Sequence, residues 1–260
     1  MTLADFTAFH FSDEGRTFKV YKKGSGPGVL VMSEMPGISP AMVTFADRVI
    51  SKGYTVWMPH LFGDDGRDST PGYVASSLAQ ACVRSEFAAL AAHRSSPVCI
   101  SLRAMCRALH AEAGGKGVGA VGMCFTGNFA LALMLEPLML VPVLSQPSLP
   151  MLPFSHDRKA ALHLSPDELA VCKKRTAAGD KILALRFSED SLVPHARFQT
   201  LKREFGDACE TFEIDSKPGN PHNIPRNAHS VLTLFFVDEP GHPTRQAMDR
   251  MFALFAERLL

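Results

Sequence analysis

The sequence predicts an α/β fold with a mostly parallel central sheet and helices on both of its faces. Apolar runs with strand character alternate with helical patterns along nearly the whole chain, which is typical of such sheets. Residues 117–123 are apolar throughout, as expected of a central strand buried on both faces. The chain has 260 residues, 46% of them apolar, which suits one α/β domain or two small ones.

Seven short segments have the apolar composition of strands. They are residues 18–23, 28–33, 54–59, 117–123, 139–144, 181–187 and 210–215. The first is expected at an edge of the sheet, and the second is expected to be buried.

The segments between these strands carry apolar residues at helical spacing. They are residues 40–52, 77–93, 97–113, the segment that starts at Phe125, the segment that starts at Ser165, 194–205 and 243–260. Loops are expected at residues 63–72, 146–166 and from the last strand to about residue 243. Ligands of parallel sheets lie at the carboxyl ends of the strands, so residues that directly follow strands are the candidates for chemistry.

Charge and composition exclude several classes of protein. The net charge of +1 gives no footprint for nucleic acid or an anionic membrane surface. The longest apolar stretch is interrupted by Glu136, Pro137 and Pro142, so it is not expected to span a membrane. The first 15 residues lack the pattern of a secretory signal. The six cysteines form no CxxC pair and no zinc-type cluster, which predicts free thiols in a reducing cytoplasm and no metal site.

The segment Gly122-Met123-Cys124-Phe125-Thr126-Gly127 lies between a predicted strand and a predicted helix. A nucleophile flanked by small residues at such a turn is typical of a nucleophile elbow, in which large neighbours would collide with the strand and the helix. The helix N-terminus favours a thiolate and a developing oxyanion. Cys124 is therefore the candidate nucleophile, although a cysteine that merely packs between strand and helix would give the same pattern.

A second motif overlaps this turn. Gly117, Gly119 and Gly122 match the GxGxxG fingerprint of dinucleotide-binding proteins. That fingerprint needs a preceding strand and a helix that starts within it, whereas here the glycines lie inside the predicted strand. The acidic residue at about the required distance, Glu136, precedes a proline. A dinucleotide-binding oxidoreductase is therefore the least favoured hypothesis.

Nucleophile-elbow enzymes carry an acid and then a histidine after the nucleophile. Asp190 directly follows the strand at 181–187, with Glu189 as its neighbouring alternative. His222 and His229 share the loop after the last predicted strand, and their positions alone do not separate them.

Glu34 follows the buried strand at 28–33, so its carboxylate either faces the same crevice as Cys124 or is a solvated charge at the end of a strand. The backbone N–H groups of Met35 and Phe125 are the candidate oxyanion donors.

With Glu34, Cys124, Asp190 and His229 in this order, the chain resembles the dienelactone hydrolase family of α/β-hydrolases. The resemblance runs from about residue 16 to the last helix and rests on SEMPG, GMCFTG, SEDSLVP and NAHSV. The small polar residue after His229 resembles the family's histidine loop and favours His229 over His222, although PGNPHN also looks like a histidine segment of this family.

The resemblance implies an α/β-hydrolase fold over one domain, residues 1–260, without a metal or an organic cofactor. It implies hydrolysis of a small-molecule ester or lactone through an acyl-cysteine on Cys124, with Asp190 and His229 as partners. It also implies that Glu34 activates the thiol. Either a monomer or a homodimer is compatible with the sequence. A fold that has lost catalysis and only binds a ligand is the main alternative.

The sequence departs from the family at the site for the substrate carboxylate. Well-known members hold this group with two arginines, and Arg84 could be the first. Four residues after His229, where the second is expected, stands Thr233. Arg226 and Arg103 are the other arginines that could take the place of this missing second arginine, and no motif favours either. The departure puts an acidic substrate in question more than the chemistry.

Overall fold

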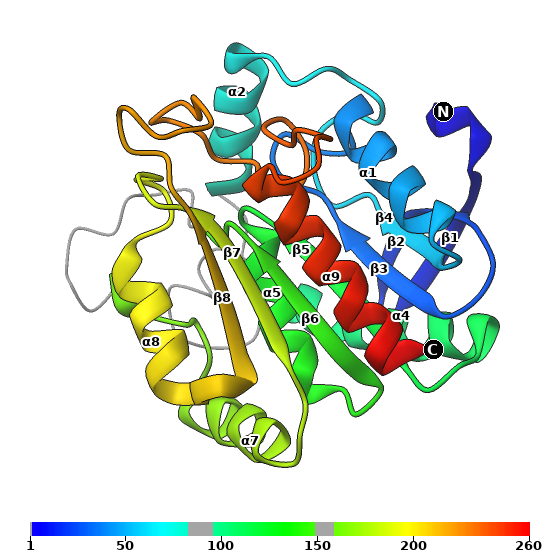
Figure 1. Cartoon of the computed structure of the whole chain (residues 1–260). Coiled ribbons are helices and arrows are strands. Elements are labelled where there is room, and N and C mark those ends of the chain that lie inside the picture. Colours follow the sequence, from blue (N-terminus) through cyan, green and yellow to red (C-terminus); the bar gives the residue numbers. More distant parts are fainter. Residues whose placement is uncertain (1, 83–95, 149–158) are drawn as a thin grey trace.

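An eight-stranded sheet organises the chain in the computed structural model, which describes residues 2–82, 96–148 and 159–260 (Figure 1). The strands stand in the order β1-β2-β4-β3-β5-β6-β7-β8. All neighbours from β4 to β8 run parallel, and β1 and β2 add an antiparallel ribbon. The strand bounds are β1 Thr7–Asp13, β2 Arg16–Lys23, β3 Gly28–Met32, β4 Thr55–Pro59, β5 Val118–Met123, β6 Met139–Ser145, β7 Ile182–Phe187 and β8 Cys209–Ile214.

Helices cover both faces of the sheet, as predicted. Buried side chains of α1 and α9 pack on one face, and those of α4, α5, α7 and α8 pack on the other (Figure 1). The helix bounds are α1 Pro40–Ser51, α2 Pro71–Cys82, α4 Pro97–Ala113, α5 Thr126–Ala132, α7 Pro166–Ala177, α8 His195–Phe205 and α9 Pro243–Leu259, with 3₁₀ turns η1 Leu3–Asp5, η2 Leu133–Leu135 and η3 Gly206–Ala208. Among the described residues, no helix has the length and apolar character that a membrane span requires.

The sequence-based prediction was wrong at the start of the chain. Strand β1 was not expected, and β2 is not an edge strand because it pairs with both β1 and β4. Strand β1 lacks a continuous apolar run, since its residues alternate between exposed and half-buried positions. One of the half-buried side chains, Phe9, packs edge-on against Trp57 with ring centroids 4.8 Å apart, which fixes the ribbon to the sheet.

Helix α2 also differs from the prediction, since it starts at Pro71 inside the expected 63–72 loop. A proline is well suited to the first turn of a helix, because its missing N–H would have no partner there. Most of the remaining helix predicted at 77–93 lies outside the described residues. Helix α7 starts as expected, with Ser165 and Glu168 forming a reciprocal capping box.

The order in which strands are added to the sheet reverses at β3. The chain forms β4 on one side of β3 and then crosses to form β5 on the other side. The crevice at such a switch point, outside the carboxyl ends of the strands, is the usual ligand site of open α/β sheets. Glu34 follows β3, Cys124 follows β5, Gln146 follows β6 and Asp190 follows β7, so four polar side chains converge on this edge.

Candidate active site

Cys124 occupies a strained turn between β5 and α5. Its backbone φ is +56°, a conformation that residues with a side chain rarely adopt. A Cβ atom added to Gly122 would lie 2.1 Å from the Thr126 carbonyl oxygen, and one added to Gly127 would lie 2.9 Å from Cα of Pro147. Glycine is thus required at both positions for steric reasons. The turn leaves the Cys124 side chain partly exposed.

Thr126 fixes this turn to the neighbouring strand. Its Oγ1 accepts a hydrogen bond from Met123 N at 2.8 Å and lies 3.0 Å from the carbonyl oxygen of Met32, to which it can donate. The sequence identified Thr126 only as a small residue beside the nucleophile. The turn needs only a small residue at this position, so the presence of a hydroxyl there was the signal that Thr126 also makes hydrogen bonds.

Replacing Thr126 by valine is expected to lower the free energy of unfolding by about 1–3 kcal/mol. Valine has the same shape, but it leaves the buried Met123 N–H without its acceptor. Urea denaturation followed by circular dichroism measures the loss. Thr126→Ser keeps the oxygen and serves as the control, with a smaller expected loss. Equal stability of Thr126→Val and the wild type would contradict the anchoring role.

His229 and Asp190 form a close pair across the carboxyl edge of the sheet. His229 Nδ1 lies 2.6 Å from Asp190 Oδ2, and the other Asp190 oxygen accepts from Leu192 N at 3.0 Å. An ionised carboxylate only accepts hydrogen bonds, so Nδ1 carries the proton. The Nε2 atom is buried and has no well-aligned partner among the described residues. It is the atom of the ring left for proton transfer.

Charge around His229 favours its protonated form. Burial lowers the pKa of His229, but the negative charge of Cys124 and the hydrogen bond to Asp190 raise it by more. The pKa therefore lies well above its ordinary value. His229 is therefore placed beside the sulfur as a group that can hold a proton.

Four further cysteines have different surroundings. Cys99, Cys106, Cys172 and Cys209 are buried. Burial raises the pKa of Cys99, Cys172 and Cys209 to about 12 and that of Cys106 higher still. They match the sequence-based interpretation of these thiols as small core residues.

His222 lies apart from the pair formed by His229 and Asp190. Its ring packs edge-on against that of His242, with centroids 5.0 Å apart. The two rings line a surface pocket together with Leu234, and burial followed by the charge of His222 lowers the pKa of His242. Within the described part of the chain, His222 makes no hydrogen bond or ring contact with Cys124 or Asp190.

Glu34 is buried, with 5% of its surface exposed, so the alternative of a solvated charge is wrong. Its Oε2 accepts from Ser230 Oγ at 2.6 Å and from Gln146 Nε2 at 3.1 Å, and its Oε1 accepts from Thr233 Oγ1. Thr233, which replaces an arginine expected from the family resemblance, therefore holds the glutamate. These donors satisfy a buried carboxylate with neutral groups.

Gln146 was missed in the sequence, where it was assigned to a proline-rich loop. It is fully buried directly after β6, with a φ of +36°. Its amide donates to Glu34, and its Oε1 accepts from Val231 N at 3.3 Å. Gln146 thus connects Glu34 to the loop that carries His229. Its position directly after a predicted strand was the signal that could have identified it.

The remaining predicted residues have separate outcomes. Met35 follows Glu34, and Phe125 directly precedes α5, so their role as oxyanion donors stays a prediction. Arg84 lies outside the described residues. Arg226 is exposed and pairs with Glu189 at 3.3 Å, and Arg103 lies on α4.

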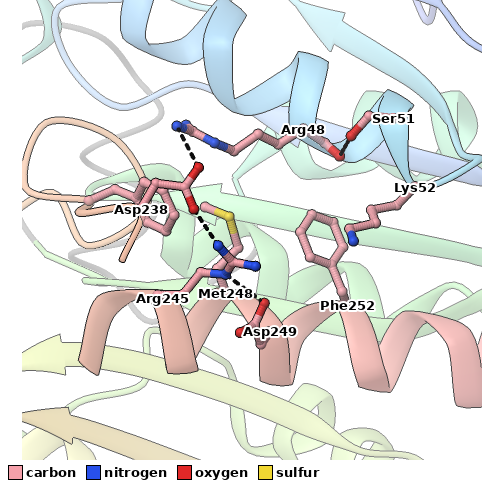
Figure 2. Close-up of a pocket in the computed structure, with 9 residues that line it drawn as sticks. Arg48, Ser51, Lys52, Asp238, Arg245, Met248, Asp249 and Phe252 are labelled. Atoms are coloured by element: carbon pink, nitrogen blue, oxygen red, sulfur yellow. Dashed lines mark hydrogen bonds and ion pairs between the residues drawn. The ribbon is translucent and has the colours of Figure 1, made fainter. Parts of the chain in front are cut away.

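A pocket of about 170 Å³ between α1 and α9 is distinct from this site (Figure 2). Arg245 pairs there with Asp249 at 2.9 Å and with Asp238, and Asp238 also lies 3.8 Å from Arg48. The charges at this pocket largely neutralise one another. The described residues contain no group of three or more His, Cys, Asp or Glu side chains arranged to hold a metal.

Comparison with known proteins gives a family and a fold. The sequence model of the dienelactone hydrolase family matches residues 16–259. Similar solved structures include a dienelactone hydrolase from Anabaena variabilis, with 14% identity, a TM-score of 0.61 and 98% of each chain covered. Another is P91, a dienelactone hydrolase-like promiscuous phosphotriesterase from metagenomic libraries, with 16% identity, a TM-score of 0.64 and 98% of each chain covered.

A third similar structure is the esterase Pf2001 from Pyrococcus furiosus, with 13% identity and a TM-score of 0.61, covering 100% of this chain and 94% of that one. A comparison with curated proteins found no match. At identities of 13–16% these similarities are evidence for the fold alone. The fold they indicate is the predicted α/β-hydrolase fold.

Proposed function

Because the chain belongs to the dienelactone hydrolase family, a family of hydrolases, we propose that it hydrolyses a carboxylic ester or lactone through an acyl-cysteine on Cys124. The observation that carries the proposal is a partly exposed thiol on a strained turn beside a histidine that is paired with a buried carboxylate at 2.6 Å. A nucleophile, a base and a group that orients the base are the parts that acyl transfer requires.

In the first half of the reaction, the Cys124 thiolate attacks the carbonyl carbon and a C–S bond forms. The oxygen of the tetrahedral intermediate is stabilised by the backbone N–H groups of Met35 and Phe125. As the intermediate collapses, the ester C–O bond breaks and His229 Nε2 gives its proton to the leaving alkoxide.

In the second half, a water molecule attacks the thioester while Nε2 of the neutral His229 takes one of its protons. The C–S bond then breaks, which releases the carboxylic acid and restores the thiolate. Asp190 keeps Nδ1 protonated throughout, so that Nε2 is the atom that exchanges protons in both halves.

The environment of Glu34 favours an uncharged substrate. A substrate carboxylate would need a cation to offset its desolvation in the crevice. The position four residues after His229 offers the hydroxyl of Thr233, which is engaged with Glu34. Glu34 itself adds negative charge near the crevice. We therefore expect neutral esters or lactones to react faster than analogues that carry a carboxylate.

Neither alternative hypothesis is supported by a specific contact. The glycines of the dinucleotide fingerprint lie within or directly before β5 instead of after it, where a phosphate would need them. A binding protein without catalysis does not require a strained cysteine beside a paired histidine.

Stoichiometric alkylation tests the proposed function directly. One equivalent of iodoacetamide is expected to abolish hydrolysis of p-nitrophenyl acetate, with the label on the peptide that contains Cys124. The deeply buried thiols are expected to react only after denaturation. Peptide mapping by mass spectrometry identifies the labelled residue. Complete modification of Cys124 with full retention of turnover would contradict the proposal, as would the absence of any esterase or lactonase activity over a panel of acyl esters and unsaturated lactones.

A further inference from the structure

The thiol of Cys124 has a partner that is neither the histidine nor the glutamate. Ser148 Oγ lies 2.9 Å from Cys124 Sγ, within hydrogen-bonding distance. Ser148 is 2% exposed. The sulfur is the one hydrogen-bond partner that its hydroxyl has among the residues that the structure describes. A buried hydroxyl is therefore directed at the reacting atom.

The backbone of Ser148 is fastened to the same turn. Its N–H donates to the Cys124 carbonyl oxygen at 3.1 Å, and its carbonyl oxygen accepts from Asn128 Nδ2 at 2.9 Å. Asn128 Nδ2 also donates to the carbonyl oxygen of Phe125 at 3.0 Å. These hydrogen bonds hold the backbone of Ser148 and the turn around Cys124 as one unit. The position of Ser148 relative to the Cys124 sulfur is therefore fixed by the backbone.

A buried arginine on α8 stabilises the backbone next to Ser148. Arg197 on α8 is 2% exposed, and its Nη1 donates to the carbonyl oxygen of Pro147 at 2.6 Å. Its Nε donates to the carbonyl oxygen of Ala161 at 3.0 Å. Burial lowers the pKa of Arg197 to about 10, still far above neutral pH, so the guanidinium stays charged there. A charged donor makes strong hydrogen bonds to carbonyl oxygens, and this one fixes the residue directly before Ser148.

The chemistry of the two groups decides the direction of the bond. A serine hydroxyl can donate or accept, a thiol is a weak donor, and a thiolate only accepts. In the proposed reaction Cys124 attacks the carbonyl carbon as a thiolate. In that state the hydroxyl hydrogen must point at the sulfur.

We propose that Ser148 is a catalytic residue that donates its hydroxyl hydrogen to the Cys124 thiolate. The proposal rests on the proposed function, since it takes Cys124 as the nucleophile. The bond stabilises the thiolate of the free enzyme and weakens when the sulfur becomes a neutral thioester, which is a poor acceptor. It forms again as the C–S bond breaks, so Ser148 also stabilises the departing thiolate during deacylation.

The test is the pH profile of Cys124 alkylation by iodoacetamide in the full chain. Ser148→Ala is expected to move the midpoint upward by about 1–2 pH units, because a hydrogen bond to a charged group is lost. It is also expected to lower kcat/KM for p-nitrophenyl acetate at neutral pH about tenfold. Ser148→Thr keeps the hydroxyl and should restore much of both effects.

The matched control is Ser101→Ala, which removes a buried serine hydroxyl on α4 and should leave both measurements unchanged. Circular dichroism verifies the fold of each variant. A folded Ser148→Ala variant with an unchanged or lowered midpoint overturns the assignment, whatever happens to turnover. Failure of the proposed function is recognised separately, because Cys124→Ala would then remain active.

Discussion

Cys124→Ala is expected to lower kcat/KM for p-nitrophenyl acetate by about 10⁴-fold or more, the size of effect seen when a covalent nucleophile is removed from a working site. Alanine retains the Cβ atom and the strained backbone but has no group that can form the acyl intermediate. Stopped-flow kinetics should show no acylation phase in the variant. The expected stability change is small, because the side chain is partly exposed and its hydrogen bond to Ser148 is a weak one made by sulfur.

Cys99→Ala is the matched control for this experiment. It removes a fully buried thiol from α4 that is not proposed to take part in the reaction. It should cost some stability through the small cavity it leaves, with kcat/KM within about twofold of the wild type. Turnover by Cys124→Ala at more than a tenth of the wild-type rate would exclude the acyl-cysteine mechanism.

His229→Gln is expected to lower kcat/KM by about 10³-fold, a typical value for the loss of a general acid–base group. Glutamine can still reach Asp190 through its amide, but it cannot exchange a proton with the leaving group or with water. Because an imidazole beside the sulfur can take the thiol proton and glutamine cannot, the variant should also react more slowly with iodoacetamide at neutral pH. Both rates can be measured on the same preparation.

His222→Gln is the matched control, since both histidines come from one loop. Its ring contacts His242 at the surface pocket, so its loss should leave kcat/KM nearly unchanged. The reverse outcome, with His222→Gln inactive and His229→Gln active, would move the base to the other histidine and invalidate the geometry argued above.

The sequence predicted the parallel part of the fold well for a physical reason. Strands such as β3 and β5 are buried along their whole length, so each is a short continuous apolar run between turn residues. Strand β1 was missed because it is half-exposed and is held by pairing with β2, which the local pattern does not encode. Tertiary pairing decided its conformation.

Some residues of the candidate site could likewise be identified from the sequence, and others could not. Cys124, Asp190 and Glu34 could be found because each directly follows an apolar run, where a parallel sheet gathers its functional groups. Thr233 could not, since its bond to Glu34 joins residues 199 positions apart. Gln146 also follows an apolar run, but it was assigned with Ser148 to the proline-rich loop at residues 146–166. Their roles depend on side-chain directions that only the folded backbone defines.

The anchoring of Glu34 has a consequence for how this site could change. Each of its three contacts, with Gln146, Ser230 and Thr233, sends a hydrogen toward the carboxylate, so the network has a fixed polarity. The two hydroxyls could reverse their polarity, but the amide nitrogen of Gln146 could not. An amide at position 34 would therefore fit in one orientation only, with its oxygen toward Gln146 and Ser230 and its NH₂ toward Thr233. The hydroxyl of Thr233 would then accept a hydrogen bond instead of donating one.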